Sequence, residues 1–235
     1  MSDNQMSYKF LITGANKGIG YALTREVMNN GYEVIALCRE TSDVIHLEKL
    51  KNVYKDKLEI FKADVTDEDK LKDISNNINQ IDVIICNAGI MGAKGGMFDQ
   101  QNTPNTILNV LMTNVAGPFF TIRTFLEKLK TSQKPKIAII SSHMGSQQHG
   151  SSDAYFYRAS KAAVNNLMVT FSSELKNYKI PVASFHPGWV RTDMGGSYAS
   201  LSPEESAKAL IKLILDLNMK DSGNFFNYDG SNLHL

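Results

Sequence analysis

The fold of this chain is decided by a glycine-rich segment near its start, Thr13-Gly14-Ala15-Asn16-Lys17-Gly18-Ile19-Gly20. An apolar run at 10–12 precedes the segment, and a helical pattern at 19–28 follows it. A glycine turn between a strand and a helix lets backbone N–H groups and the helix N-terminus approach a pyrophosphate. The segment therefore predicts a dinucleotide-binding fold, with an ordinary glycine turn as the alternative.

Short apolar runs alternate with longer helical patterns along the rest of the chain. We interpret as strands the runs near 8–13, 33–38, 57–63, 81–86, 136–141, 180–186 and 223–228. The helical patterns cover 18–30, 42–52, 67–79, 103–130, 157–178 and 203–218. Helices of this length can make the crossovers that parallel strands require. The pattern predicts an α/β protein, a single-domain doubly wound Rossmann fold with a seven-stranded parallel sheet flanked by helices.

Length and charge limit the kinds of partner. The 235 residues, 43% of them hydrophobic, suit one domain over 1–235 with a flexible N-terminus at 1–7. A formal net charge of +1 gives no global field for nucleic acid or an anionic membrane. No apolar stretch approaches the roughly 18 residues that span a bilayer. We expect a cytoplasmic protein that binds a small molecule, with no nucleic-acid and no membrane partner.

The cysteines and histidines give no sign of a metal site. Cys38 and Cys86 each end an apolar run, so we interpret them as buried thiols in a reducing compartment. The five histidines show no ligand-pair spacing, which favours surface or loop roles over metal binding. A hydrolase is also disfavoured, because the chain has no Gly-x-Ser-x-Gly elbow.

Tyr157 and Lys161 form the candidate catalytic pair, in the segment Tyr157-Arg158-Ala159-Ser160-Lys161. Side chains four positions apart project from one face of a helix, so both can act on one small volume. A phenol has a reference pKa of about 10, and a nearby ammonium with an oxidised nicotinamide would stabilise its phenolate. Tyr155 competes for the role, but no lysine follows it at the fourth position, so we assign it to the pocket wall.

The ordered motifs resemble the short-chain dehydrogenase/reductase family. The resemblance covers essentially the whole chain and rests on the glycine spacing, Asn87-Ala88-Gly89, Ser142, the Tyr157/Lys161 pair and Pro187-Gly188. It implies that Tyr157 donates the proton to a carbonyl oxygen, that Lys161 binds the nicotinamide ribose and that Ser142 orients the substrate. Ser142 is preferred to Ser141 because two residues and a glycine follow it. Asn114 matches the asparagine that holds a water for proton relay.

The same resemblance implies the residues that bind the cofactor. They are Gly14, Asn16, Lys17, Gly18, Ile19, Gly20, Arg39, Asp64, Val65, Asn87, Ala88, Gly89, Tyr157, Lys161, Pro187, Gly188, Val190 and Thr192. Asp64, Val65 and Asn87 would contact or support the adenine side. Val190 and Thr192 would contact the nicotinamide carboxamide.

The residue after the second strand indicates which dinucleotide binds. An acid about twenty residues after the glycine motif would clamp the ribose diol of NAD and repel a 2′-phosphate. Cys38 stands there, while Arg39 and Lys17 supply two cations for a phosphate. We therefore predict NADP(H) in preference to NAD(H). Glu40 could oppose this preference, and Arg39 could be a solvated charge at the strand end.

Apolar side chains surround the expected substrate pocket. Met144, Tyr155, Trp189 and Met194, with Met91 and Tyr198, favour an apolar or aromatic carbonyl over a charged one.

Two further segments, 186–196 and 222–230, look like those of sniffer-type carbonyl reductases and C-factor-like proteins. We expect NADPH-dependent reduction of an aldehyde, ketone or quinone to an alcohol by hydride transfer. A dinucleotide-binding signalling or regulatory protein of C-factor type, with little turnover, is the alternative. Leu233-His234-Leu235 stands where those relatives usually have Leu-Pro-Trp, a departure that affects the end of the last strand.

Two of the expected helices, 103–130 and 157–178, carry apolar residues on more than one face. We predict a homodimer or homotetramer through these helices, with burial of both faces inside one chain as the alternative. The residues concerned are Leu108, Leu111, Val115, Phe119, Ile122, Leu126, Val164, Leu167, Met168, Val169 and Phe171.

Overall fold

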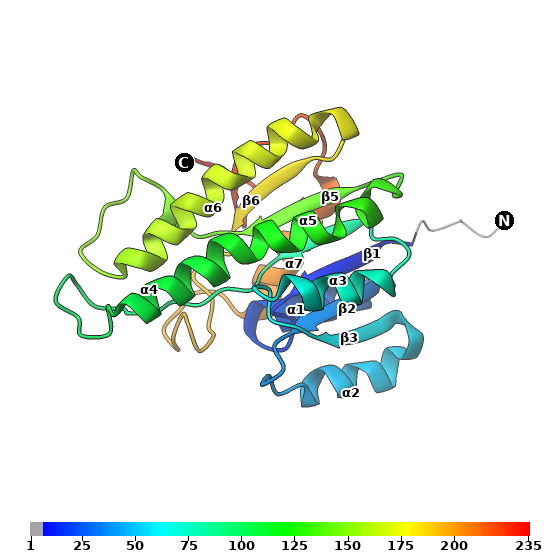
Figure 1. The fold of residues 1–235 in the computed structure, drawn as a ribbon, viewed down its shortest axis with the longest axis horizontal. Helices are drawn as coiled ribbons and strands as arrows, with labels where there is room; N and C mark the ends of the chain where they lie inside the picture. The colour runs from blue at the N-terminus through cyan, green and yellow to red at the C-terminus, as the bar shows by residue number, and fades with distance from the viewer. Residues whose placement is uncertain (1–6) are drawn as a thin grey trace.

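The expected strands assemble into one central sheet in a computed structural model that describes residues 7–235. Over that range the sheet has eight strands, in the order β3-β2-β1-β4-β5-β6-β7-β8 (Figure 1). The strands are β1 (Lys9–Thr13), β2 (Glu33–Cys38), β3 (Leu58–Lys62), β4 (Val83–Cys86), β5 (Lys136–Ile140), β6 (Val182–His186), β7 (Phe225–Asn227) and β8 (Asn232–Leu233). β1 to β7 are parallel, and β8 pairs antiparallel with β7.

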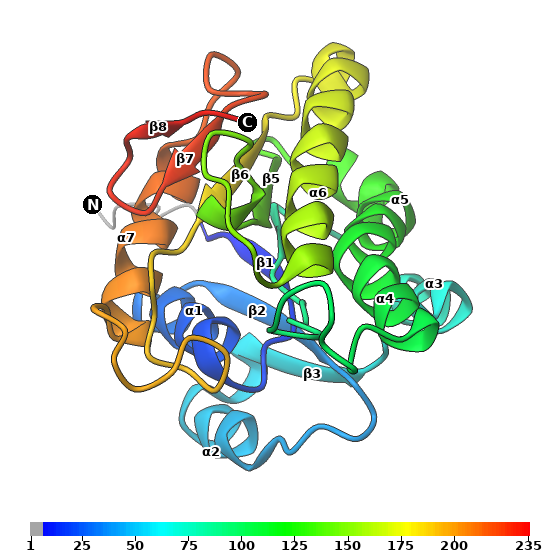
Figure 2. The ribbon, with the colours of Figure 1, turned by 90° about the vertical axis from the view of Figure 1, so that its left-hand side faces the viewer.

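Helices cover both faces of the sheet (Figure 2). The helices are α1 (Gly18–Asn29), α2 (Ile45–Tyr54), α3 (Glu68–Asn76), α4 (Pro104–Leu111), α5 (Gly117–Lys130), α6 (Tyr155–Glu174) and α7 (Pro203–Asp216). Successive strand residues alternate between the layers: Phe10 and Ile12 pack with α1, α2 and α7, whereas Leu11 packs with α3, α5 and α6. Because both layers are apolar, the strands are continuous hydrophobic runs.

The chain reverses its direction of winding at β1. From β1 it moves outward to β2 and β3, and it then crosses back to place β4 on the other side of β1. In open sheets, ligands bind beyond the carboxyl ends of the two strands at such a switch point. The predicted doubly wound Rossmann fold is thus confirmed, and it directs attention to the segments after β1 and β4.

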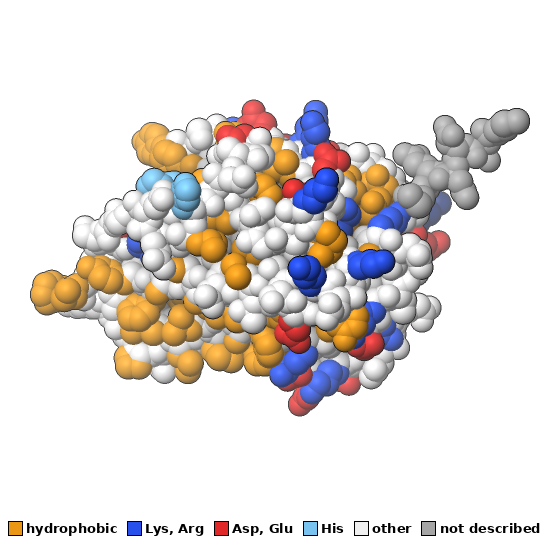
Figure 3. Space-filling view, turned by 90° about the horizontal axis from the view of Figure 1, so that it is seen from above, with side chains coloured by type: hydrophobic (Ala, Val, Ile, Leu, Met, Phe, Trp, Pro, Cys, Tyr) orange, Lys and Arg blue, Asp and Glu red, His pale blue; other side chains and the backbone are white. Residues whose placement is uncertain are grey.

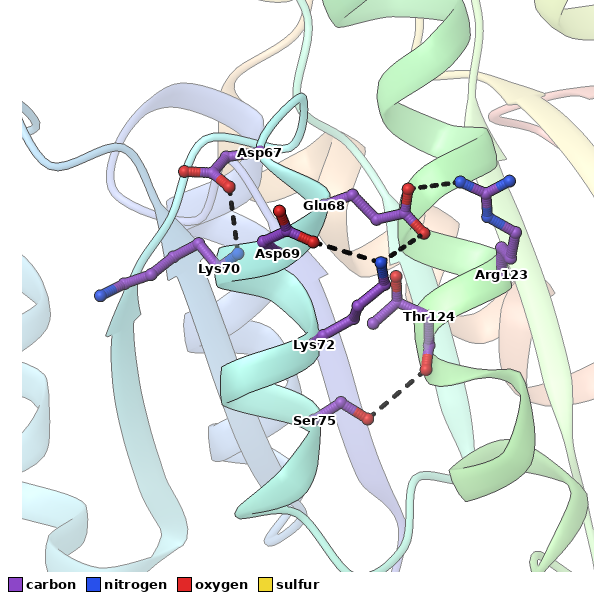
Figure 4. A network of polar contacts seen from close by, with 8 residues as sticks. All are labelled: Asp67, Glu68, Asp69, Lys70, Lys72, Ser75, Arg123 and Thr124. Atoms are coloured by element: carbon purple, nitrogen blue, oxygen red, sulfur yellow. Dashed lines mark hydrogen bonds and ion pairs between the residues drawn. The ribbon is translucent and has the colours of Figure 1, made fainter.

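Polar contacts are found at the helix ends and between helices on the outer surface. Ser202 and Glu205 form a capping box at the start of α7, which satisfies N–H groups that the helix leaves free. On the outer surface, Arg123 of α5 donates to Glu68 of α3 at 2.5 Å, and Lys72 also pairs with Glu68 (Figure 4). Exposed pairs of this kind add about 0–1 kcal/mol each, so apolar packing holds the layer together.

Several element bounds differ by two or three residues from the predicted ones, and the structure also adds a strand and divides a helix. β8 adds an eighth strand to the predicted seven, and α6 begins at Tyr155, two residues early. The single helix predicted at 103–130 is divided by a π-helical turn, Met112–Ala116. Pro118 follows that turn and has no N–H to continue the α-helical ladder, which explains the division.

Two further expectations concern the N-terminal segment and membrane-spanning helices. The flexible segment expected at 1–7 falls, apart from Ser7, outside the described residues. Within residues 7–235, none of the helices combines the length and the apolar character needed to cross a bilayer.

We expect Phe125→Ala to destabilise the protein by about 3–5 kcal/mol, because the side chain is fully buried between α5 and the sheet and its loss leaves a cavity. Phe98→Ala is the matched control, since Phe98 is 93% exposed and its loss opens no cavity. Urea denaturation of both variants measures the difference in unfolding free energy. Equal losses in the two variants would contradict this assignment of the core.

Candidate active site

The predicted glycine loop, 14–17, leaves β1 and enters α1 at the switch point. Gly14 and Gly18 adopt left-handed φ values of +65° and +54°, which side-chain-bearing residues rarely take. A Cβ on Gly20 would lie 2.1 Å from the carbonyl oxygen of Gly14, and one on Gly14 would lie 2.9 Å from Cα of Ala88. Only glycine fits this close packing of the loop against the segment after β4.

Asn87 and Thr13 fasten the glycine loop to the segment after β4. Nδ2 of Asn87 donates to the carbonyl oxygens of Thr13 at 2.9 Å and of Gly14 at 3.2 Å. Oγ1 of Thr13 accepts from the backbone N–H groups of Asn87 and Ala88, both at 3.0 Å. Asn87 therefore supports the loop itself. Thr13 is absent from the sequence-based site because a threonine at the end of a strand gives no signal of its own.

The loop and the start of α1 fit the pyrophosphate of a dinucleotide. Lys17 is the N-cap residue, and its side chain makes no capping bond. The first turn of α1, which includes Ile19, contains no acidic residue. Free N–H groups and the helix dipole at such an end attract anions. The glycines of the loop have no side chains that would shield its backbone N–H groups from an anion.

The residues predicted to choose between NADP and NAD lie at the ends of β2 and α1. Cys38 is buried and its Sγ lies 3.8 Å from the carbonyl oxygen of Phe61. Arg39 is exposed and makes no ion pair with another described residue. Lys17 is also exposed, but its Nζ lies 2.8 Å from Oδ2 of Asp193, a partner that the sequence does not indicate.

Asn16 and the two remaining residues predicted to support the adenine side, Asp64 and Val65, lie in neighbouring turns. Nδ2 of Asn16 donates to the carbonyl oxygen of Asp43 at 3.2 Å. Oδ1 of Asp64 accepts from the backbone N–H of Thr66 at 2.9 Å. Val65 is buried, and a Cβ on Gly117 would lie 2.6 Å from its Cγ2. Both Asp64 and Val65 follow β3, at the carboxyl edge of the sheet.

The segment from Pro187 to Thr192 leaves β6 at the same edge. Gly188 has φ of +83°, and a Cβ there would lie 2.3 Å from Leu201. The carbonyl oxygen of Pro187 accepts from Oγ of Ser206 at 2.6 Å. Val190 is buried, and Thr192 reaches the glycine loop, with its Cγ2 3.3 Å from where a Cβ on Gly18 would stand.

The candidate catalytic pair is deeply buried at the start of α6. Tyr157 is 7% exposed and Lys161 5% exposed, and Nζ of Lys161 lies 5.6 Å from the centre of the Tyr157 ring. Nζ donates to the carbonyl oxygen of Ile140 at 2.8 Å. A Cβ on Gly89 would stand 3.6 Å from that nitrogen. The helix thus brings the pair to the segments after β4 and β5.

Burial dominates the protonation of both groups. It raises the pKa of Tyr157 to about 12, against the smaller opposing effect of a hydrogen bond with Ser142. It lowers the pKa of Lys161 to about 8. The expectation that the ammonium and an oxidised nicotinamide together favour the phenolate stays a prediction; without the nicotinamide, burial is the largest influence on the pKa of the phenol. Tyr157 is a neutral phenol at neutral pH.

Ser142 rather than Ser141 faces Tyr157. Ser142 lies close enough to the phenol to lower its pKa, and its Oγ accepts from the backbone N–H of Met144 at 3.1 Å. Oγ of Ser141 donates instead to the carbonyl oxygen of Lys161. Gly145 explains the Ser-x-x-Gly pattern, since a Cβ there would lie 2.7 Å from the backbone of Lys161.

Asn114 lies within the π-helical turn, and both its side-chain oxygen and its side-chain nitrogen are hydrogen-bonded. Its Oδ1 accepts from the N–H of Ile90 at 2.8 Å, and its Nδ2 donates to the carbonyl oxygen of Ile90 at 2.9 Å and to Oγ of Ser160 at 3.0 Å. Oδ1 also lies 3.3 Å from where a Cβ on Gly89 would stand, close to Lys161. Ser160 was not predicted, and it links Asn114 to the carbonyl oxygen of Tyr157.

The predicted pocket residues lie at the start of α6 and in the segments after β5 and β6. Met144 and Met194 are half-buried, Tyr155 is 41% exposed and Trp189 is 57% exposed. Apolar side chains gather toward the end of the molecule where these segments lie, and most charges lie toward the other end (Figure 3). The assignment of these residues to a substrate pocket stays a prediction.

Three histidines gather next to Ser142. The ring of His143 lies 3.9 Å from that of His149 and 5.7 Å from that of His186, measured between ring centres. His186 ends β6 and is mostly buried, contrary to the surface or loop role expected of it, and burial lowers its pKa to about 4. Among residues 7–235, no group of three or more histidine, cysteine, aspartate or glutamate side chains is arranged to hold a metal ion.

The family model for short chain dehydrogenases matches residues 9–201. The chain belongs to this family. The described structure also resembles solved short-chain dehydrogenases closely. Carbonyl reductase Sniffer of Drosophila melanogaster matches with a TM-score of 0.91 and 29% identity, over 98% of this chain and 100% of that one.

Two further matches correspond to the two groups that the sequence resembles, the carbonyl reductases and the C-factor-like proteins. An NADPH-bound carbonyl reductase from chicken fatty liver matches with a TM-score of 0.87 and 30% identity, over 97% of this chain and 99% of that one. The C-signal protein of Myxococcus xanthus is 34% identical over 152 residues, which are 64% of this chain and 90% of that protein. Both resemblances predicted from the sequence are confirmed.

We expect Gly20→Ala to displace the glycine loop and abolish dinucleotide binding, because the added Cβ would collide with the Gly14 carbonyl oxygen at 2.1 Å. Gly150→Ala is the matched control, since nothing lies within 4 Å of a Cβ there. Isothermal titration calorimetry with NADPH measures the effect. Undiminished NADPH binding by Gly20→Ala would contradict the close packing described here.

Proposed function

We propose that this short-chain dehydrogenase reduces an aldehyde, ketone or quinone to an alcohol, using NADPH as hydride donor and Tyr157 as proton donor. The observation that carries the proposal is the placement of Tyr157. Its phenol is buried and lies close to Ser142 and Lys161, at the edge of the sheet where the glycine loop lies. No other tyrosine combines these contacts among the described residues.

Reduction of a carbonyl needs a proton donor, and the neutral phenol of Tyr157 can serve as one. When bound, NADPH supplies a hydride to the carbonyl carbon, and the carbonyl oxygen then needs a proton. A phenol whose pKa is about 12 carries that proton at neutral pH. Ser142 can hydrogen-bond the same oxygen and so orient the substrate.

Lys161 and Asn114 support the donor. At neutral pH the amine of Lys161 is mostly protonated, since its pKa is about 8. Its Nζ is held by the carbonyl oxygen of Ile140, beside Gly89 and Asn114. We assign Lys161 to the nicotinamide ribose and Asn114 to a water that would return a proton to Tyr157 by way of Lys161.

The preference for NADP is also part of the proposal. Arg39 is exposed at the end of β2, and the position of the diol-binding acid is occupied by the buried thiol of Cys38. A guanidinium binds a phosphate in a bidentate manner. The chicken carbonyl reductase, whose fold this chain shares, was crystallised with NADPH, which supports the same choice. The apolar pocket mouth favours an apolar or aromatic substrate.

A signalling or binding role with little turnover is the second candidate, and the similarity to C-signal favours it. The buried Tyr157, Ser142 and Lys161 favour turnover instead, because a module that only binds a dinucleotide has no need of a sequestered phenol. Both candidates retain cofactor binding, so only an assay of turnover separates them.

We expect Tyr157→Phe to lower kcat for carbonyl reduction by about 10²–10⁴-fold, the contribution of a general acid, while the Kd for NADPH changes little. The assay follows NADPH and NADH oxidation separately with aldehydes, quinones, diketones and steroids. Tyr178→Phe is the matched control and should retain activity, because Tyr178 is 52% exposed and lies beyond the far end of α6. An inactive wild type that binds NADPH tightly would favour the signalling role.

We also propose that two copies associate through α4, α5 and α6. Leu108 and Val169 on these helices are 56% and 38% exposed. Burial inside the chain accounts for Ile122, Val164, Met168 and Phe171, so it explains part of the apolar pattern. The exposed remainder is available to a second copy of the chain.

We expect light scattering after size-exclusion chromatography to give at least twice the 26.1 kDa chain mass. Leu108→Glu with Val169→Glu should shift the protein to the monomer, because two charges would be buried at the interface. A monomeric wild type at micromolar concentration would refute the association.

A further inference from the structure

The loop after β6 touches the glycine loop at two adjacent positions. Nζ of Lys17 lies 2.8 Å from Oδ2 of Asp193, and the two residues are 176 positions apart. Next to this ion pair, Cγ2 of Thr192 stands 3.3 Å from where a Cβ on Gly18 would be. The lysine expected to bind a phosphate is therefore already paired with a carboxylate from another loop.

The loop that carries Asp193 is organised by its own contacts. Val190 and Leu201 form a β-bridge at its base, and the N–H of Arg191 donates to the carbonyl oxygen of Leu201 at 2.9 Å. Nε1 of Trp189 donates to the carbonyl oxygen of Gly195 at 2.8 Å. This internal bonding gives the loop a fixed shape, so Asp193 is presented to Lys17 from a defined position.

We propose that Asp193 sets the strength of the NADP preference by competing with the cofactor's 2′-phosphate for Lys17. The inference rests on the proposed use of NADP. Asp193 acts through Lys17 and is a positioning residue. Lys17 exchanges Asp193 for the phosphate when NADP binds, and it keeps Asp193 when NAD binds.

Charge decides which anion Lys17 prefers. A phosphate monoester carries about −1.5 to −2 at neutral pH, against −1 for a carboxylate. The hydrogen bond and charge of Lys17 lower the pKa of Asp193, so the carboxylate is ionised at neutral pH. One ammonium is a compact charge on a flexible stem, and two anions gathered around it repel each other. The phosphate therefore displaces Asp193, and the loss of the Lys17–Asp193 ion pair reduces the affinity that the 2′-phosphate adds to NADP binding.

The exposure of the pair sets the size of the effect. The side chains of Lys17 and Asp193 are 68% and 84% exposed. An ion pair in that setting corresponds to a change of about two- to fivefold in an equilibrium constant. We expect Asp193→Asn to tighten NADPH and 2′,5′-ADP binding by about that factor. Binding of NADH should stay unchanged because it has no 2′-phosphate.

The test is a double-mutant cycle followed by calorimetry. Wild type, Asp193→Asn, Lys17→Met and the double variant are each titrated with NADPH, NADH and 2′,5′-ADP at low salt. Lys17→Met should weaken the two 2′-phosphorylated ligands and cancel the gain from Asp193→Asn. Glu204→Gln is the matched control, because Glu204 also forms an exposed ion pair, with Arg25 at 2.9 Å, and its loss should leave all three affinities unchanged.

The results of this test distinguish failure of the inference from failure of the proposed function. Unchanged or weaker 2′,5′-ADP binding by Asp193→Asn would overturn the inference alone, provided that wild type binds NADPH. The same gain in the Lys17→Met background would also overturn it, because Asp193 would then act without Lys17. A wild type that binds NADH but not NADPH would overturn the proposed cofactor and the inference together.

Discussion

The close approach of two backbone segments at the switch point is the constraint on which the rest of this structure depends. The glycine loop passes within van der Waals distance of the segment after β4, and only hydrogen atoms fit at Gly14 and Gly20. Thr13 and Asn87 bond the two segments together from both sides. Because β1 and β4 are adjacent and parallel, this junction also fixes where the carboxyl edge of the sheet opens toward a ligand.

The positions of the catalytic candidates depend on that junction. Gly89 directly follows Ala88 of the junction and lies against both Asn114 and Lys161. Asn114 in turn binds Ser160, and Ser160 binds the backbone of Tyr157. A continuous set of contacts therefore runs from the glycine loop to the phenol. The same packing buries Tyr157, and the segment after β5 can lie against α6 because Gly145 has no side chain to collide with the backbone of Lys161.

The parts of the fold that could be predicted are those that repeat a local pattern. The parallel strands are continuous apolar runs because both of their faces are covered, and the glycine spacing marks the turn into α1. β8 could not be predicted, because Asn232 and Leu233 are too few to show a period. The π-helical turn was missed because its cause is the missing N–H of Pro118, which changes hydrogen bonding and not hydrophobic spacing.

The candidate site was predictable where chemistry and spacing coincide, as in Tyr157 and Lys161. It was not predictable where a contact joins distant segments: nothing near Lys17 in the sequence points to Asp193, and nothing near Thr13 points to Asn87. The protonation of Tyr157 also depends on burial, which spacing does not report.

The antiparallel strand β8 has a consequence for how the molecule behaves at high concentration. An open parallel sheet ends in a row of unsatisfied amide and carbonyl groups that can recruit a strand from another molecule. By folding back along β7 for two residues, β8 covers the outer edge of that strand with a stretch too short to serve as a template itself. The chain thereby protects one side of its sheet against edge-to-edge aggregation.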